Sequence, residues 1–340
     1  MASLAFLFGM IPGTEKVESA DDQLRADYAA FQEYEKSDEL KHFLELEKEV
    51  TSGDFAIRKK KIPKKEYKNS EEFQKEEEYK VLKKSDKITW YFNTKKKNPF
   101  REVAKWEETF NEPFTGSRLD EKTWMTRYYW GDAILDEPYT MSDEKSFPTE
   151  GKNIEFYDKK ARLVTKAEEV EGKKWDPVHG FLQDSFEYTS ALMSTGKSFR
   201  QKYGIFKAKI KMAPADMTQA FWLVSNGLVP HIDVAKYEKG KLWANYFWAT
   251  RSGQAPSKSV SKTGGSRYTS DFYIFSLEWS PGKLVWKIND KTFKTQSSGV
   301  PQEEMYMVFS TGLKRWSSDN GLPAAMEIDW IRVYKLKDQD

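Results

Sequence analysis

In the last two thirds of the chain, apolar and polar residues alternate with a period of two. Clear examples are residues 205–212, 272–279 and 284–288, which are rich in aromatic and β-branched side chains. Such alternation is typical of half-buried strands, because successive side chains of a strand point to opposite faces of a sheet. Turn signals such as Asn289-Asp290 separate the segments. Since no helical pattern intervenes, the sequence predicts a mostly β fold, an antiparallel β-sandwich (jelly roll) over residues 105–336.

Residues 1–104 differ, because they are rich in Glu and Lys and place apolar residues at helical spacing. Four serines there precede acidic residues; the serine accepts a hydrogen bond from a free N–H, and the acids favour the helix dipole. Helices are therefore expected to begin at Ser37, Ser52, Ser70 and Ser85. The segment is predicted to be an N-terminal α-helical appendage. Two roles stay open for it: a solvated appendage packed on the main domain, or a module that docks onto a protein partner.

Charges in the chain are nearly balanced, with 55 Lys and Arg against 53 Asp and Glu, a net charge of +2. This balance argues against a nucleic-acid partner, which normally requires a clearly basic domain. The chain has no Cys, which excludes disulfides, thiolate metal sites and a lipid anchor on cysteine. Its three histidines are scattered, so a histidine metal cluster is not expected. No cofactor is expected to be required.

The chain begins with a short apolar run, residues 1–10, without a preceding positive charge. A secretion signal normally has a basic start and a longer apolar core, and a membrane span is longer still. The run is interpreted as a docking segment or as the trimmed end of a longer chain, and no transmembrane segment is expected. A cytoplasmic location or a place in an assembly is expected unless another export route applies. Residues 337–340 are predicted to form a short tail.

Four segments of the second part carry motifs in a fixed order. They include Tyr-Gly-Ile-Phe-Lys-Ala-Lys-Ile-Lys at 203–211 and Leu-Glu-Trp-Ser-Pro-Gly at 277–282. The full set comprises residues 110–124, 188–211, 275–289 and 326–334. In order and spacing it resembles glycoside hydrolase family 16, particularly the laminarinase-like members. The resemblance implies a concanavalin A-like jelly roll whose cleft holds a polysaccharide of the β-glucan class.

One strand of that family carries the catalytic motif Glu-x-Asp-x-x-Glu, in which the resemblance implies a nucleophile, a tuning Asp and an acid/base. Here the three positions hold His231, Asp233 and Lys236. The Asp remains and both glutamates are replaced. The uneven spacing requires a β-bulge to bring all three side chains to one face. We expect a static Asp233–Lys236 ion pair, with a hydrogen bond from His231.

These replacements bear on the chemistry, because retaining glycosidases need two carboxyl groups about 5–5.5 Å apart. The imidazole of His231 cannot form the glycosyl ester. The ammonium of Lys236 places positive charge beside a centre that becomes positive in the transition state. The sequence therefore predicts a pseudoenzyme that has lost hydrolysis by the family mechanism, although enzymatic activity of another kind stays open.

Aromatic side chains in such clefts stack on sugar rings. The resemblance implies glycan contacts at Tyr128, Trp130, Trp222, Asn245, Trp248 and Trp316. For each ring, burial in the core is the competing interpretation. The resemblance also implies a structural calcium ion with Asp329 as a ligand, although Pro113 stands where a second carboxylate commonly lies.

Three functions follow from these features. The first is a catalytically inactive protein of the family 16 type that binds a β-glucan-type polysaccharide. The second is a structural or assembly component, for example of a virion or surface complex, that docks through the helical segment and uses the sandwich as a decoration domain. The third is an active endo-β-1,3-glucanase with an altered mechanism. Fold alone does not separate them.

Overall fold

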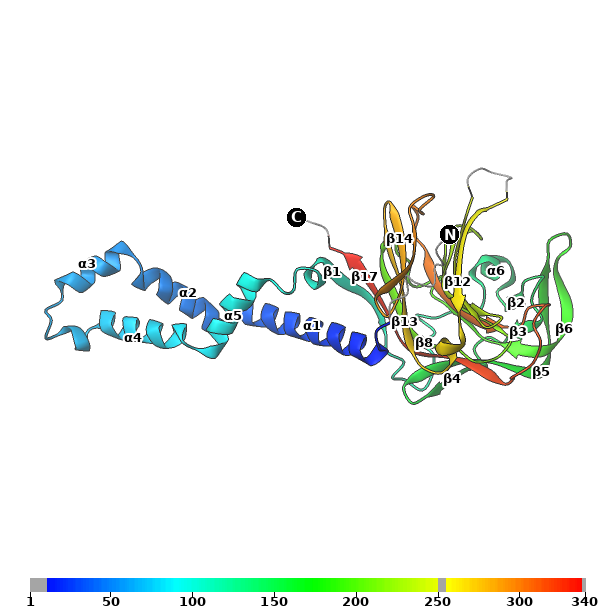
Figure 1. Cartoon of the computed structure of the whole chain (residues 1–340), viewed down its shortest axis with the longest axis horizontal. Coiled ribbons are helices and arrows are strands. Elements are labelled where there is room, and N and C mark those ends of the chain that lie inside the picture. The colour runs from blue at the N-terminus through cyan, green and yellow to red at the C-terminus, as the bar shows by residue number, and fades with distance from the viewer. Residues whose placement is uncertain (1–10, 250–254, 338–340) are drawn as a thin grey trace. The chain divides into compact units, whose positions relative to one another are not determined.

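The computed structural model describes residues 11–249 and 255–337 (Figure 1). The chain folds into two compact units. The helical unit is Glu18–Trp106, and the sandwich unit comprises the described residues up to Val17 together with those from Glu107 onward. The apolar run at residues 1–10, for which a docking segment was predicted, lies outside the described residues, as does most of the predicted tail.

Four of the helices begin at the predicted serines. In each case the serine hydroxyl accepts a hydrogen bond from the backbone N–H three residues later, at 3.1–3.2 Å, which satisfies one free donor of the first turn. All four predicted N-caps are therefore confirmed. The helices of this part are α1 (Thr14–Glu35), α2 (Asp38–Val50), α3 (Gly53–Lys61), α4 (Glu71–Lys83) and α5 (Asp86–Lys97), with short 3-10 turns η2 (Tyr67–Asn69) and η3 (Val103–Lys105).

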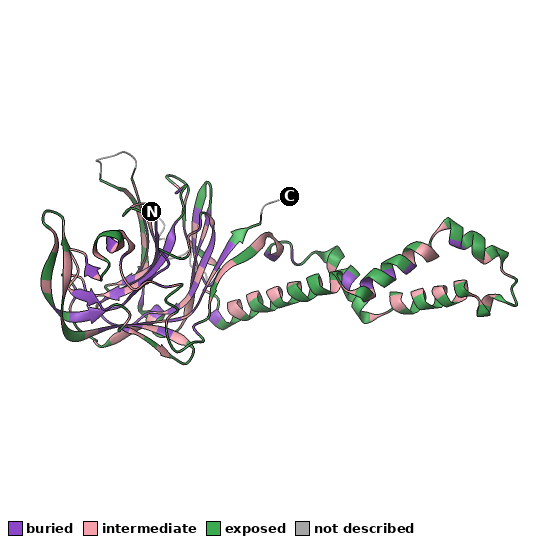
Figure 2. Ribbon diagram, turned by 180° about the vertical axis from the view of Figure 1, so that it is seen from behind, coloured by how far each residue is buried: buried purple, intermediate pink, exposed green. Residues whose placement is uncertain are grey.

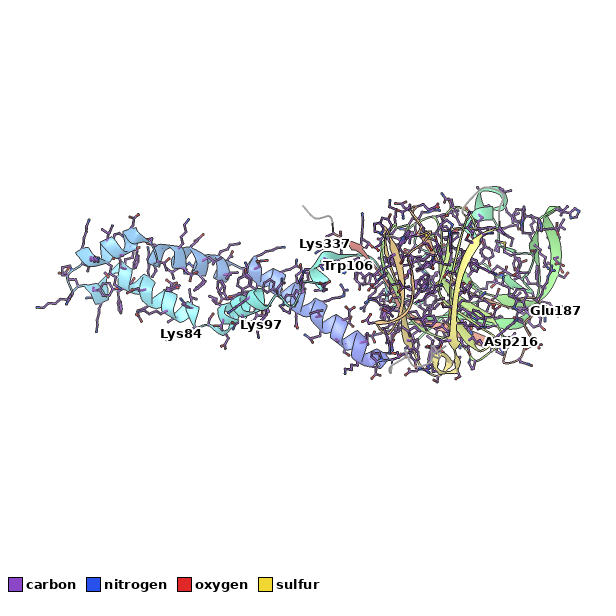
Figure 3. The ribbon with its side chains drawn as sticks, turned by 45° about the horizontal axis from the view of Figure 1, so that its top comes forward. Lys84, Lys97, Trp106, Glu187, Asp216 and Lys337 are labelled. Carbon is purple, nitrogen blue, oxygen red and sulfur yellow. The ribbon has the colours of Figure 1, made fainter. Side chains whose placement is uncertain are left out.

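The helical unit has a small core, and most of its surface is exposed (Figure 2). Leu40, Phe43, Ile88 and Tyr91 are buried in one cluster, which α2 and α5 supply. Exposed lysines such as Lys84 cover the outer faces (Figure 3). None of the helices in the described ranges combines the length and hydrophobicity that a membrane span needs.

Two sheets form the sandwich unit, as the alternation predicted. Among the described residues, eleven strands form one sheet and six form the other. The larger sheet contains β1 (Trp106–Glu112), β2 (Tyr139–Thr140), β3 (Ser146–Pro148), β4 (Ile154–Tyr157), β5 (Lys160–Asp176), β6 (Gly180–Ser190), β8 (Gly204–Lys211), β13 (Tyr273–Ser280), β14 (Lys283–Ile288), β15 (Lys291–Gln296) and β17 (Ala324–Leu336). The smaller sheet has the order β12 (Ser257–Gly264), β11 (Lys241–Trp248), β10 (His231–Glu238), β9 (Thr218–Val224), β16 (Tyr306–Gly312) and β7 (Leu192–Ser194). The predicted antiparallel sandwich is confirmed, with short parallel pairings only at β2 and β3 among the described strands.

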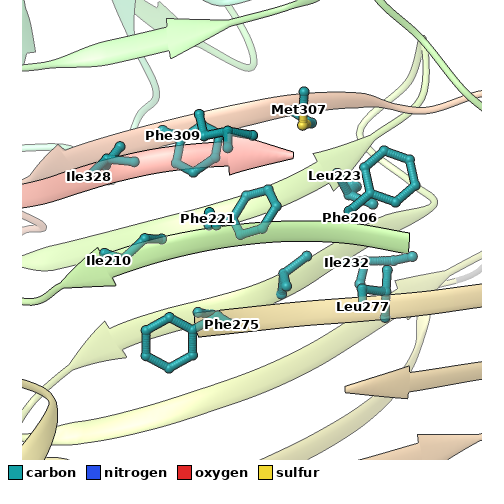
Figure 4. Packing of buried hydrophobic residues seen from close by; sticks show 14 of the residues in the cluster. Phe206, Ile210, Phe221, Leu223, Ile232, Phe275, Leu277, Met307, Phe309 and Ile328 are labelled. Carbon is teal, nitrogen blue, oxygen red and sulfur yellow. The ribbon is translucent and has the colours of Figure 1, made fainter. Parts of the chain in front are cut away.

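The main core lies between the two sheets (Figure 4). Phe221 of β9 stacks on Phe309 of β16 at 4.5 Å between ring centroids, and Phe206 and Leu277 approach from the larger sheet. All these side chains are fully buried. Because each strand buries alternate residues, the remaining residues of β9, β10, β11 and β16 face away from the core.

A second apolar cluster covers part of this outer face of the smaller sheet. Helix α6 (Tyr129–Leu135) and β2 supply Trp130, Leu135 and Tyr139, which pack on residues of β7, β9 and β16. The strands β10, β11 and β12 contribute no residue to this cluster. The outer face of the smaller sheet is therefore covered on one half and open on the other.

Candidate functional site

A pocket of about 480 Å³ lies on the outer face of the smaller sheet, between the covered and the open half. Its wall is formed by β9, β10, β16 and the residues that precede and follow β2. The lining includes Tyr128, Trp130, Met141, Glu144, Thr218, Trp222, Leu228, His231, Asp233, Lys236, Phe247, Pro256, Ser310, Thr311 and Lys314. Six of the residues singled out in the sequence therefore meet in one pocket, whereas Asn245, Trp248 and Trp316 are not among its lining residues.

The β10 strand brings His231, Asp233 and Lys236 to the pocket through a bulge. Its pairing with β9 shifts register between Asp233 and Ala235, and its pairing with β11 shifts between Asp233 and Lys236. One extra residue at this point restores the side-chain alternation that an i, i+2, i+5 spacing would otherwise break. The β-bulge expected from the spacing is present.

Asp233 is an almost completely buried carboxylate, with 3% of its surface exposed. Nε2 of His231 lies 2.8 Å from its Oδ1, and Nδ2 of Asn245 donates to its Oδ2 at 2.7 Å. Burial acts to raise the pKa of Asp233, but the charges of His231 and Lys236 and these hydrogen bonds outweigh it, so the pKa is lowered. Since an ionised carboxylate only accepts hydrogen bonds, Nε2 of His231 carries the proton between them.

Lys236 has a different partner from the one expected. Its Nζ lies 3.5 Å from Oε2 of Glu238, whereas Asp233 is paired with His231. The other oxygen of Glu238 accepts hydrogen bonds from Thr218 and from the indole N–H of Trp316, each at 3.0 Å. The predicted Asp233–Lys236 ion pair is therefore wrong in its partner, because Glu238 lies on the same face of β10 as Lys236.

The pocket contains a series of stacked rings. Tyr128 stacks on Trp130 at 5.2 Å between centroids, Trp130 on Trp222 at 5.9 Å, and Trp222 on the imidazole of His231 at 4.7 Å. Trp130 is anchored by a hydrogen bond from its Nε1 to the carbonyl of Gly227 at 3.0 Å. This packing leaves only 6% of Trp222 exposed. The indole of Trp222 is consequently covered, and it does not offer a free face to a sugar.

The two remaining tryptophans for which glycan contacts were predicted, Trp316 and Trp248, differ in their surroundings. Trp316 is 50% exposed and lies beside Glu238. The predicted glycan contact of Trp248 is wrong, because Trp248 stacks on the core residue Tyr246 at 4.7 Å between ring centroids and packs with the main core. Strand alternation explains the difference, because Trp248 follows Asn245 by an odd number of residues. The same alternation brings Phe247, which the sequence did not single out, into the pocket.

Glu144 is a second lining carboxylate that the sequence did not indicate. Its Oε1 accepts a hydrogen bond from Tyr128 at 2.7 Å and lies 3.4 Å from Nζ of Lys314. Its Oε2 accepts the backbone N–H of Met141 at 2.8 Å. Among the described lining residues, Asp233 and Glu144 are the two carboxylates. No motif surrounds Glu144, so no sequence signal could have found it.

The residues implied for a calcium ion do not fit that role. Asp329 lies 2.7 Å from Nζ of Lys209. Both oxygens of Glu112, the acidic neighbour of Pro113, accept hydrogen bonds, from the backbone N–H of Phe114 at 3.0 Å and the indole of Trp124 at 3.1 Å. Calcium requires several oxygen ligands. The described residues contain no group of three or more metal-ligating side chains.

A two-sheet sandwich with a ligand-sized pocket on the outer face of one sheet defines a β-sandwich protein of the jelly-roll class. The family model for glycosyl hydrolases family 16 matches residues 141–332, and the chain belongs to that family. It is 24% identical over 282 residues to glucan endo-1,3-beta-glucosidase A1 of Niallia circulans, covering 68% of this chain and 37% of that protein. It is also 24% identical over 253 residues to the endo-1,3-1,4-beta-glycanase EglC of Rhizobium meliloti, covering 67% and 52% of the two chains. The chain thus spans about a third to a half of these relatives' length.

Solved structures show the same fold. The catalytic domain of the laminarinase from Thermotoga petrophila RKU-1 aligns with a TM-score of 0.54 at 20% identity, over 68% of this chain and 99% of that one. The kappa-carrageenase from Pseudoalteromonas carrageenovora aligns with a TM-score of 0.55 at 17% identity, over 67% and 94%. At these identities the likeness establishes the jelly roll and nothing finer.

Proposed function

We propose that this protein binds a polysaccharide of the β-glucan class on the outer face of the smaller sheet and does not hydrolyse it by the two-carboxylate mechanism. The observation that carries the proposal is the pairing of His231 with Asp233 at 2.8 Å inside an intact β-bulge. The bulge brings residues 231, 233 and 236 to one pocket, while the side chains at the first and last of these positions are an imidazole and an ammonium.

Neither lining carboxylate has the properties of a proton donor or nucleophile. A group whose pKa is lowered, as for Asp233, is ionised at neutral pH and has no proton to give to a leaving oxygen. The same group is buried and accepts two hydrogen bonds, so it is poorly placed to attack. Glu144 is held by Tyr128 and by a backbone N–H. These contacts support binding without hydrolysis.

The test measures cleavage and binding on the same preparation. We expect no release of reducing ends from laminarin, lichenan or agarose, and retarded migration in affinity electrophoresis with laminarin. Trp316→Ala removes a half-exposed ring that is hydrogen-bonded to Glu238, the partner of the lining residue Lys236, and should weaken the retardation. Trp175→Ala, at 37% exposure on β5 of the larger sheet, is the matched control. Hydrolysis by the wild type that is lost in Asp233→Asn would instead establish an active glucanase with an altered mechanism.

An assembly role is the second candidate, and the helical unit supports it. Trp90 and Phe92 of α5 are each 39% exposed, and Val81 of α4 is 69% exposed. Exposed large apolar side chains often mark protein contacts. If the unit associates with further copies of the chain, sedimentation velocity should show a concentration-dependent oligomer that Trp90→Glu dissociates. A monomer at all concentrations would remove self-assembly from consideration.

A further inference from the structure

The open half of the outer face carries lysines that the pocket residues do not explain. The ladder between β11 and β12 pairs Trp243 with Lys262, Asn245 with Val260, and Phe247 with Lys258. Paired residues of an antiparallel ladder point to the same face. Since Phe247 lines the pocket, Lys258 and Lys262 lie on the pocket face of the sheet.

Two further lysines share that face from interior strands. Lys241 lies on β11 two residues before Trp243, and Lys236 lies on β10 inside the pocket. Strand β12 alternates Ser-Lys-Ser-Val-Ser-Lys-Thr-Gly from Ser257, so its lysines fall on this one face and its hydroxyl residues on the other. The pattern gives the open half of the face four ammonium groups.

The carboxylates on this half of the face already interact with other side chains. Glu238 interacts with Lys236, Thr218 and Trp316, and Asp233 is buried against His231. Lys241 lies opposite Glu238 in the ladder between β10 and β11, so one carboxylate faces both Lys236 and Lys241. Lys258 and Lys262 are exposed and make no ion pair with any carboxylate in the described ranges. The Nζ of Lys262 lies 4.8 Å from the ring centroid of Trp243, a partly exposed ring.

We propose that the polysaccharide bound by this face is anionic, with carboxylate or sulfate groups on its sugars. This inference rests on the proposed glycan-binding function and assigns its ligand class. Lysines flanking a partly exposed indole fit such a ligand, because the ring contacts the C–H face of a sugar while the ammonium groups pair with its acid groups. Lysines on an edge strand also discourage edge-to-edge pairing of sheets. Edge protection does not account for Lys236 and Lys241, which lie on interior strands.

The experiment compares laminarin with carboxymethylated laminarin, which has the same backbone and added carboxylates, by isothermal titration of the full chain. We expect the charged glycan to bind more tightly and to weaken in high salt, since exposed charges are screened. Lys258→Gln with Lys262→Gln should weaken binding of the charged glycan roughly tenfold, the effect of two exposed ion pairs, and leave laminarin unchanged. The control removes the same charge elsewhere, with Lys159→Gln in the turn between β4 and β5 and Lys283→Gln at the start of β14, both at exposed positions.

Each alternative result has a definite meaning. Equal affinity for both glycans, unaffected by the Lys258 and Lys262 changes, overturns the anionic ligand while the proposed glycan binding stands. No binding of either glycan overturns the proposed function and this inference with it. Equal, lysine-dependent binding of a short DNA oligonucleotide overturns the assignment to a glycan. Unchanged binding with increased self-association of the double variant would assign Lys258 and Lys262 to edge protection and overturn the inference.

Discussion

The imidazole Nε2 of His231 lies 2.8 Å from Oδ1 of Asp233, and Nδ2 of Asn245 lies 2.7 Å from the other carboxylate oxygen. The backbone carbonyl of Asp233 accepts a further hydrogen bond from the buried indole of Trp286 at 2.9 Å. Residue 233 therefore links β10 to β11 and to β14 of the opposite sheet. Through these contacts Asp233 holds the bulge in place, so its removal should lower the stability of the sandwich.

Replacement of Asp233 by Asn should destabilise the sandwich by about 3 kcal/mol, as expected when one partner of a buried charged network is removed. The amide of the new side chain would face the N–H groups of His231 and Asn245, so that a donor meets a donor. Equilibrium unfolding in urea measures the change. Asp290→Asn, in an exposed turn, is the control and should alter stability by less than about 0.5 kcal/mol. Equal stability of the two variants would mean that the network contributes nothing.

Acid should weaken the same network. The pKa of Asp233 is lowered in the folded protein, so between the folded and unfolded values the unfolded chain binds more protons. The stabilisation is complete above the ordinary aspartate pKa of about 3.9 and is lost as the pH falls through the folded value. The difference in unfolding free energy between wild type and Asp233→Asn should therefore shrink below about pH 4. A difference that is constant from pH 6 to pH 3 would contradict the assignment.

Trp222 and Trp316 should respond oppositely to truncation. Trp222 is 6% exposed, stacks on two rings and donates a hydrogen bond to Ser310 at 3.1 Å, so Trp222→Ala should cost about 4 kcal/mol of stability. Trp316 is 50% exposed, so Trp316→Ala should leave stability within about 1 kcal/mol and reduce glycan binding. Thermal unfolding and affinity electrophoresis on both variants distinguish these effects. A stable Trp222→Ala variant with impaired binding would mean that the indole is accessible to ligand.

Features that depend on neighbouring residues could be predicted from the sequence. The serine caps need only a hydroxyl and a backbone N–H three residues away, and all four are formed. The bulge follows from the spacing of 231, 233 and 236 on a strand whose face alternates. Burial of Trp279 and Trp286 in the main core also follows from alternation, because they share a face with the buried residues Leu277 and Leu284 of their strands.

Features that depend on distant segments could not be predicted. The covering of Trp222 requires Trp130 from α6, about ninety residues earlier in the chain, and no periodic pattern links the two. The partner of Lys236 was misassigned because two acidic residues, Asp233 and Glu238, compete for it, and the fold decides between them. Trp248 was placed by analogy of position, although the period of two from Asn245 already indicated the opposite face.

The surroundings of Lys294 of β15 also depend on segments that are distant in the sequence. Its side chain is buried between the sheets, with 7% of its surface exposed. Its Nζ donates to the carbonyls of Ala244 at 2.8 Å and Ser259 at 2.7 Å, and it lies 4.5 Å from the ring centroid of Trp286. Burial lowers the pKa of Lys294 to about 8, although the negative charge of Asp233 acts in the opposite direction. The folded protein thus releases this proton at a lower pH than the unfolded chain does.

Stability should therefore increase with pH between about 8 and 9, before the tyrosines of the unfolded chain begin to titrate around their ordinary pKa of about 10. In this window the unfolded chain keeps the proton on Lys294 while the folded protein loses it, so the free energy of unfolding rises by about 1 kcal/mol. Urea unfolding at several pH values measures the rise. Lys294→Met should abolish it, whereas Lys283→Met, at an exposed position, should preserve it. If the rise persists without the ammonium of Lys294, another group titrates, and the buried lysine is neutral or solvated over the whole range.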